Sequence, residues 1–330
     1  MHLVLDITTS AEFWRRIYPA DRTPKLDRFS VPERCALNQR DIDALKPSWI
    51  TPEFLEPIGG KLHVFSLAGH TSKNRNRSVV HAWSGPIPEE SFYDLGNNVL
   101  VQTPPFMFLV AATLLDPEQL IAFGFELCGL YGFDDTQKRG FRKRSAPLTT
   151  LSRLREYLSG AKGCRGREKA LSALAYILER SASPMETYDV MCLCLPYRLG
   201  GYCIKSPKMN HRVNLTPRAR RIARRKKCYL DMGYPEEHLD VEHHGKLDHS
   251  SSEDRASDRA RVNALREMGY EVIELTIDQV EDIEAFDYIV QRIAGILGKR
   301  IRKEYLGVTA ARVRLHQKLR EWNRTGGRLR

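Results

Sequence analysis

The sequence lacks several features that would assign its class directly. It has no Cys-x-x-Cys pair, so it offers neither a zinc-ribbon nor a thioredoxin-like motif, and its seven scattered cysteines are an odd number. The longest apolar stretch, around residues 106–115, is too short to span a bilayer. The first residues lack the charged start and apolar run of a signal peptide. We therefore expect a reduced, cytoplasmic protein without a membrane segment.

The sequence excludes fibrous and low-complexity classes of protein, because its glycine and proline contents are ordinary. The 330 residues include 22 Gly and 17 Pro, and no short repeat runs through them. A hydrophobic fraction of 42% is enough for a sizeable core, and the length favours two domains. Lys and Arg total 52 against 41 Asp and Glu, a net charge of +11 that favours a polyanionic partner.

The first half of the chain predicts a lead-in followed by a mixed module. Residues 1–55 have no clear period, and we interpret them as a small helical lead-in. Residues 56–135 predict an α+β module, with strands at 62–67, 78–83 and 98–103 and helices at 106–115 and 118–127. Residues 136–182 are rich in Lys and Arg and predict a basic linker with a helix at 168–181, which is either a solvated connector or a nucleic-acid contact.

Residues 183–298 predict an α/β domain. Ser183 is a good N-cap, Pro184 suits the first helical position, and strands are expected at 202–204, 228–232, 239–244 and 271–275. Further helices are expected at 259–268 and 284–297, so the sheet should be mixed and flanked by helices. Residues 299–330 form a basic C-terminal tail with a helical pattern at 308–322, which either attracts phosphates or is simply solvated.

Acidic residues on these elements predict a metal site. Asp231 and Glu242 fall on strands whose ends are neighbours, and Glu186 lies on the first helix of the domain. Carboxylate oxygens suit Mg²⁺ (or Mn²⁺), which orients water and stabilises the leaving oxygen of a phosphodiester. His244 lies two residues after Glu242 and is a candidate base. Glu186 has an alternative role, because it is placed to complete a capping box with Ser183.

Basic residues near these acids predict a nucleic-acid surface, and a zinc site is the poorer interpretation of the histidines. His243 and His244 are adjacent on a strand and point to opposite faces, so they do not easily share one ion. His249 is a candidate for holding a phosphate or a water molecule. The candidate phosphate-binding residues are Arg220, Arg221, Arg224, Arg225, Lys226, His249 and Arg261.

Residues 183–298 resemble the domain related to very-short-patch-repair endonucleases, within the PD-(D/E)XK nuclease superfamily. The resemblance is carried by Ser183-Pro184-Met185-Glu186-Thr187, by Asp231, by Val241-Glu242-x-x-Gly245 with His249, and by Asp258-Arg259-x-Arg261-x-Asn263-x-Leu265-x-x-x-Gly269. It implies a restriction-endonuclease-like fold, metal-binding acids at Asp231 and Glu242, and a helix glutamate at Glu186.

The third motif position departs from that family. The superfamily often has lysine two residues after the glutamate, and this branch usually has aspartate, whereas this chain has His244. The resemblance implies a Mg²⁺-dependent DNA endonuclease or nickase in defence or mobile-element biology. The alternative is a non-catalytic DNA-binding or toxin–antitoxin regulatory protein that retains the fold.

Residues 56–135 resemble the C-terminal part of abortive-infection-type antitoxin proteins. The resemblance is carried by Val80-His81-Ala82-Trp83, by the strand ending at Thr103-Pro104 and by the helix after it. That family reads DNA with an N-terminal winged helix, and residues 1–55 show no pattern for one.

Overall fold

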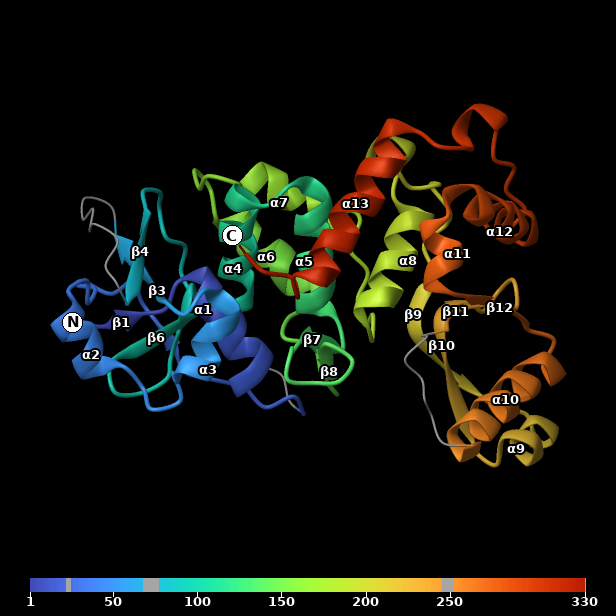
Figure 1. Cartoon of the computed structure of the whole chain (residues 1–330), viewed down its shortest axis with the longest axis horizontal. Helices are drawn as coiled ribbons and strands as arrows, with labels where there is room; N and C mark the ends of the chain where they lie inside the picture. Colours follow the sequence, from blue (N-terminus) through green and yellow to red (C-terminus); the bar gives the residue numbers. More distant parts are fainter. Residues whose placement is uncertain (22–24, 68–76, 245–251, 330) are drawn as a thin grey trace. The chain divides into compact units, whose positions relative to one another are not determined.

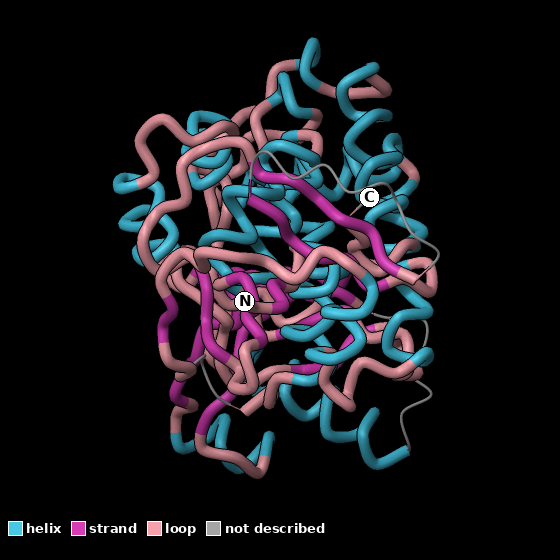
Figure 2. The backbone as a smooth tube through the Cα atoms, turned by 90° about the vertical axis from the view of Figure 1, so that its left-hand side faces the viewer, coloured by secondary structure: helices cyan, strands magenta, loops and turns pink. Residues whose placement is uncertain are grey.

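The chain folds into two compact units. The computed structural model describes residues 1–21, 25–67, 77–244 and 252–329. Unit 1 comprises Met1–Ile177 with Trp322–Arg330, and unit 2 comprises Leu178–Glu321. Both units contain helices and strands, so the protein is mixed α/β (Figures 1 and 2). Among the described residues, no helix is long and apolar enough to cross a membrane.

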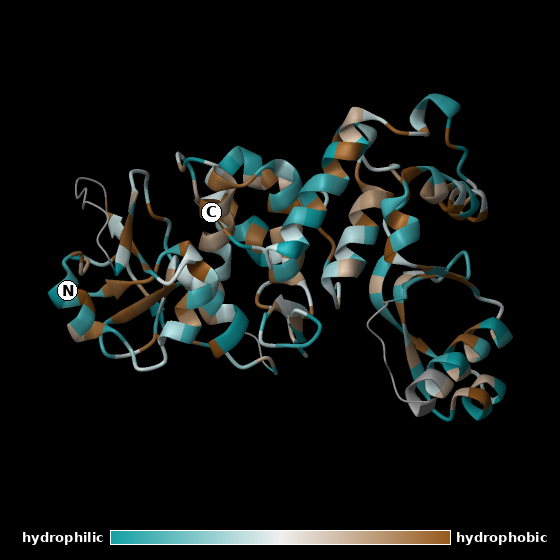
Figure 3. Cartoon of the chain, viewed as in Figure 1, coloured by the Kyte–Doolittle hydropathy of each residue, from teal (hydrophilic) through white to brown (hydrophobic). Residues whose placement is uncertain are grey.

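A four-stranded sheet in unit 1 begins with the first residues of the chain. Its strand order is β1 (Leu3–Val4), β6 (Val99–Gln102), β5 (Phe92–Asp94) and β2 (Arg28–Phe29), and only β1 and β6 are parallel. Strands β1 and β6 are buried and take the hydrophobic colour in Figure 3. The expectation of a helical lead-in over 1–55 is therefore incomplete, because β1 and β2 belong to this sheet.

Predicted strands and helices of residues 56–135 are confirmed. Strands β3 (Leu62–Leu67) and β4 (Ser78–Trp83) form a parallel pair. Helix α4 (Pro104–Leu114) is capped by Thr103, and α5 (Pro117–Cys128) begins with a capping box at Asp116. Residues 104–112 of α4 are all buried, so this helix forms part of the core.

The predicted linker over 136–182 is wrong, because most of this segment is folded into unit 1. Helices α6 (Leu151–Gly160) and α7 (Arg167–Leu174) bury Leu154, Leu158 and Ala170, while their cations lie on the other face. The remaining elements of unit 1 are α1 (Ile7–Glu12), α2 (Gln39–Leu45), α3 (Pro52–Leu55), β7 (Tyr131–Phe133) and β8 (Phe141–Lys143).

A buried ion pair fastens several parts of unit 1 together. The Arg15 guanidinium donates to both carboxylate oxygens of Glu126, at 2.8 and 2.7 Å, and to the carbonyl oxygen of Gly327 at 2.9 Å. The side chains of Arg15 and Glu126 are 3% and 2% exposed. Glu12 also contacts Arg15, at 3.2 Å. One guanidinium thus joins the segment after α1 to α5 and to the C-terminal residues.

Arg15→Met should destabilise unit 1 by about 3–5 kcal/mol, because it leaves the Glu126 charge buried without a partner. All four tryptophans, Trp14, Trp49, Trp83 and Trp322, belong to unit 1, so urea unfolding followed by tryptophan fluorescence reports on this unit. Glu156→Ala is the control, since Glu156 is 68% exposed in its pair with Arg153 and should cost below about 1 kcal/mol. Equal losses in the two variants would contradict a fastening role for Arg15.

Unit 2 is built on a mixed sheet with helices on both faces. Its strand order is β12 (Glu271–Leu275), β11 (Leu239–His243), β10 (Lys227–Tyr234) and β9 (Lys208–Asn214), and only β11 and β12 are parallel. Adjacent residues of β11 point to opposite faces, and His243 contacts α8 (Pro184–Cys194) while Glu242 contacts α10 (Ser252–Glu267). These two helices therefore cover opposite faces, as Figure 1 shows.

The predicted strand over 202–204 is wrong. The N–H groups of Tyr202, Cys203 and Ile204 donate to the carbonyl oxygens of Cys192, Leu195 and Leu193, at or just after the end of α8. The segment thus satisfies carbonyls that a helix end leaves free, and β9 follows a few residues later. The strands predicted at 228–232, 239–244 and 271–275 are confirmed as β10, β11 and β12, although β10 runs on to Tyr234.

The C-terminal tail is packed rather than solvated over most of its length. Helix α13 (Ala310–Arg324) buries Leu315, Leu319 and Trp322, the face that its apolar spacing predicts. Arg312 is 2% exposed in its ion pair with Asp287. The other helices of unit 2 are α9 (Pro217–Ala223), α11 (Ile277–Glu281) and α12 (Ile283–Ile296).

Candidate active site

Asp231 and Glu242 lie at the same end of the hairpin formed by β10 and β11. The pairing of Tyr234 with Leu239, Gly233 with Asp240 and Met232 with Val241 leads directly to these two residues, which come next on each strand. Glu242 is 6% exposed and Asp231 is half-buried. In an antiparallel pair, residues that face each other have Cβ atoms about 4.5–5.5 Å apart, so this register supports the predicted proximity of the two acids.

Arg261 on α10 holds both oxygens of Glu242. Its Nη2 donates to Oε2 at 2.7 Å, and its Nη1 donates to Oε1. Burial alone lowers the pKa of Arg261, but the bonded Glu242 and the charges of Asp231 and Asp240 raise it above its ordinary value. Arg261 was predicted to contact nucleic acid. In the structure it is only 17% exposed in this ion pair and serves as the counter-charge of the acids.

Asp240 is a third acid at this site, and the sequence analysis missed it. The residue is fully buried on β11, two positions before Glu242. Burial, followed by the neighbouring Glu242 and Asp231, raises its pKa well above the ordinary value. Alternation in Leu239-Asp240-Val241-Glu242 is the signal that could have found it, because it places both acids on one face.

His243 forms a second ion pair on the opposite face of the sheet. Its Nδ1 lies 2.8 Å from Oδ2 of Asp189 on α8, and Asp189 is fully buried. Burial lowers the pKa of His243, but the hydrogen bond to Asp189 and the charge of Asp189 raise it by more. The pKa of His243 is therefore above its ordinary value. Burial also raises the pKa of Asp189. The pair holds β11 against α8 and keeps His243 away from Glu242.

Asp189→Asn should lower the pKa of His243, because it removes the charge that keeps the imidazole protonated. The pKa of His243 is raised on folding, so its stabilising contribution is complete below the unfolded value of about 6.5 and is lost as pH rises through the folded value. NMR titration of the imidazole measures the change, with His211 on β9 as the internal control. An unchanged His243 pKa would show that another group raises it.

Glu186 and His244 lie at element ends. The Glu186 N–H donates to Oγ of Ser183 at 3.1 Å, and its Oε2 accepts from the N–H of Ala182 at 2.8 Å. The capping role that the sequence left open for Glu186 is therefore present. His244 follows the last residue of β11, is exposed, and donates its N–H to the carbonyl oxygen of Leu275 at 2.6 Å. Its side chain is thus exposed just after the end of β11 that carries Glu242.

The basic residues of the predicted nucleic-acid surface follow α9 and the turn after it. Arg220, Arg221, Arg224 and Lys226 are exposed, and Arg225 is half-buried. Nη2 of Arg225 donates to Oγ of Ser257 at 2.6 Å, one turn of α10 before Arg261. Burial raises the pKa of the Cys228 thiol, and Asp240 and Glu242 raise it further, whereas Arg261 and Arg225 lower it. Charges from the basic turn and from the acids thus act on the same side chain. This basic turn therefore lies next to the acids.

His249 and the helix of the basic C-terminal tail were also candidates for binding phosphates. His249 lies outside the described residues. The helical part of the tail does not lie beside α9, because His316 of α13 bonds to Tyr188 of α8 at 2.9 Å, and α8 covers the other face of the sheet. Of the two predicted basic segments, α9 with its turn is therefore the one beside α10, the helix that contacts Glu242.

Replacing Arg220, Arg221 and Arg224 together with Gln should weaken binding to nonspecific duplex DNA and flatten its salt dependence. Each lost phosphate contact should lower the slope of log K against log salt concentration by roughly 0.9. Fluorescence anisotropy at several salt concentrations measures this slope. The matched control replaces Arg300, Arg302 and Lys303, which are also exposed cations of unit 2, with Gln. Equal effects of the two triple variants would show that only net charge matters.

Comparison with known proteins adds no relative to this geometry. No protein-family model, no curated protein and no solved structure matches the chain.

Proposed function

We propose that unit 2 is a metal-dependent DNA endonuclease or nickase that hydrolyses phosphodiester bonds. The observation that carries this proposal is the register that brings Asp231 and Glu242 to one end of the β10–β11 hairpin, with the basic turn after α9 beside them. The element order α8, β9, β10, β11, α10, β12 also agrees with the restriction-endonuclease-like fold that the sequence resemblance implies. The proposed cofactor is Mg²⁺ or Mn²⁺.

The acids explain why a divalent cation would bind here. The charges of Glu242 and Asp231 repel negative charge on Asp240 and raise its pKa, and Arg261 supplies a single positive charge among the three acids. A hard dication held by the oxygens of Asp231 and Glu242 would offset this repulsion. The ion supplies polarisation of the phosphate and orientation of a water molecule. His244 would take the proton of that water as its oxygen attacks phosphorus and the bond to the leaving sugar oxygen breaks.

The ion pair between Arg261 and Glu242 would be the resting state of the site, before a metal ion binds. Both oxygens of Glu242 are occupied by its guanidinium, so a metal ion and Arg261 compete for the same carboxylate. If an ion took Glu242, the Arg261 guanidinium would be released beside the bound DNA, where its planar donors would suit a phosphate. The nucleic-acid role predicted for Arg261 would then belong to the metal-loaded state.

A regulatory protein without catalysis is the second candidate. It is favoured by the same Arg261–Glu242 ion pair, because a side-chain cation already neutralises the metal-binding acid, and by His244 in the third motif position. In this alternative, the basic turn after α9 binds DNA and the acids serve stability alone. The seven free cysteines suit the reducing cytoplasm in which we expect either protein to act.

Asp231→Ala and Glu242→Ala should each abolish Mg²⁺-dependent cleavage, because each removes an oxygen ligand, while DNA binding should persist through phosphate contacts. Cleavage of duplex, single-stranded and mismatched DNA is measured with Mg²⁺ and with Mn²⁺. Glu236→Ala is the matched control, because Glu236 is an exposed acid in the turn at the other end of the hairpin. A wild-type protein that binds these substrates and cleaves none of them would establish the regulatory alternative.

A further inference from the structure

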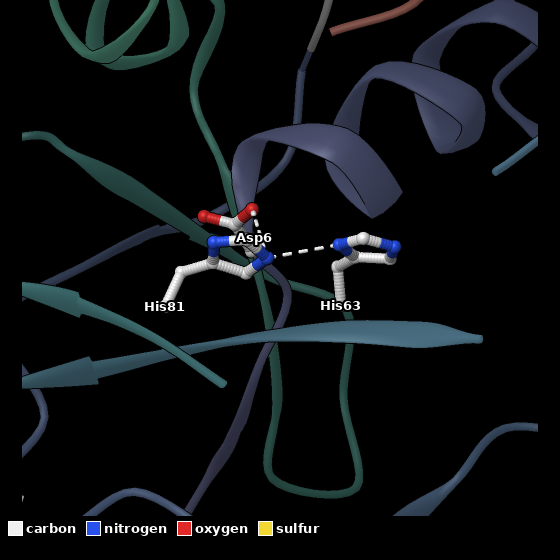
Figure 4. Close-up of side chains that lie close together, drawn as sticks. All are labelled: Asp6, His63 and His81. Carbon is white, nitrogen blue, oxygen red and sulfur yellow. Dashed lines mark hydrogen bonds and ion pairs between the residues drawn. The ribbon is translucent and has the colours of Figure 1, made fainter. Parts of the chain in front are cut away.

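Unit 1 contains a group of metal-ligating side chains that the proposed nuclease chemistry does not use. Asp6, His63 and His81 each direct one ligand atom to a common point, and these atoms all lie within 4.8 Å of one another. Nδ1 of His63 lies 2.9 Å from Nε2 of His81, which lies 3.8 Å from Oδ2 of Asp6 (Figure 4). Ligand atoms about 2.1 Å from one ion are about 3–3.5 Å apart, so these separations bracket those of a metal centre.

The backbone holds two of the three ligands in a fixed relation. The Asp6 N–H donates to the carbonyl oxygen of His63 at 3.1 Å. The Thr9 hydroxyl, one turn into α1, donates to the same carbonyl at 2.9 Å and accepts from the His63 N–H at 3.0 Å. Strand β4, which pairs in parallel with β3, brings His81 to the same place. Such preorganisation of the ligand positions is what a metal site requires.

The hydrogen bonds also select the tautomer of a ligand. Nε2 of His63 lies 3.2 Å from the carbonyl oxygen of Ile58, so this nitrogen carries the proton and Nδ1 presents its lone pair. A metal-binding histidine commonly donates its other N–H to a backbone carbonyl in this way.

The direct contacts among Asp6, His63 and His81 do not provide a hydrogen bond for each of the three side chains. At 3.8 Å, His81 is too far from Asp6 for a hydrogen bond, although Asp6 is only 3% exposed and its carboxylate is a helix N-cap with a long 3.5 Å contact to the Thr8 N–H. A dication between the three groups would satisfy the carboxylate and both nitrogens together.

We infer that Asp6, His63 and His81 form a binding site for a first-row transition-metal dication. Two imidazoles and one carboxylate favour ions such as Zn²⁺, Fe²⁺ or Mn²⁺ over Mg²⁺ and Ca²⁺, which prefer all-oxygen sets. Asp6 is buried, whereas the His81 side chain is 44% exposed, so water or a small ligand can reach the remaining coordination positions. The site belongs to unit 1 and is independent of the proposed Mg²⁺ site in unit 2.

The test is titration of the chelator-treated full chain with Zn²⁺ against a chromophoric competitor, with the visible spectrum of the Co²⁺ form as a second measurement. We expect one ion per chain at this site. His63→Ala, His81→Ala and Asp6→Asn should each weaken binding by more than the roughly 10- to 100-fold that loss of an outer-shell partner costs. Asp6→Asn keeps an N-cap acceptor and His81 is well exposed, so these two variants should remain folded.

His211→Ala is the control, because it removes a histidine of unit 2 that lies on β9 and belongs to neither proposed site, and it should leave the stoichiometry and affinity unchanged. Circular dichroism checks the fold of every variant, and Zn²⁺ should raise the melting temperature of the wild type but not of His81→Ala. The inference is overturned if the wild type binds neither Zn²⁺ nor Co²⁺, or if His81→Ala and Asp6→Asn bind as tightly as the wild type. It is also overturned if binding is lost in His211→Ala instead.

Discussion

Arg261 is the counter-charge of Glu242 within unit 2 and donates to both of its carboxylate oxygens. The pair is largely removed from water, with side-chain exposures of 8% and 17%, so each charge would be costly without the other. It also fixes the distance between α10 and β11, and thereby the position of the basic turn that touches α10 at Ser257. Charge neutralisation at one carboxylate therefore places the acids, the helix and the basic segment together.

On the opposite face of β11, a buried charge is likewise held in an ion pair. Asp189 and His243 form a pair that holds α8, in the way that Glu242 and Arg261 hold α10. Neighbouring residues of one short strand thus make buried ionic contacts in opposite directions, which leaves little freedom for the strand to slip, since a shift by one residue would bury both charges without partners. The geometry of the candidate site is for this reason a property of the whole sheet.

Elements with strong local signals were predictable, and elements that depend on distant partners were not. The bounds of β4 and β12 match the predicted strands, and α5 extends the helix predicted at 118–127 by one residue at each end. By contrast, β1 is two residues long and is a strand only because it pairs with β6, almost a hundred residues later. Residues 202–204 look like a strand because they are apolar, yet their hydrogen bonds go to the end of α8. The basic composition of 136–182 concealed α6, whose apolar face is narrow, whereas α7 begins within one residue of the helix predicted at 168–181 and ends earlier, at Leu174.

The residues of the candidate sites also divide into those with a local sequence signal and those that depend on distant partners. Glu242 and Asp231 were found because a resemblance pointed to their spacing, whereas Asp240 and Asp189 have no motif of their own and matter only through burial beside a charged neighbour. Asp6, His63 and His81 are spread over 75 residues and come together only because β1, β3 and β4 end up beside one another. Single ligands at such separations leave no pattern in a sequence, because what defines a metal site is the convergence of its atoms. In both units, therefore, the chemistry depends on which strands pair, and strand pairing is the property that local sequence specifies least.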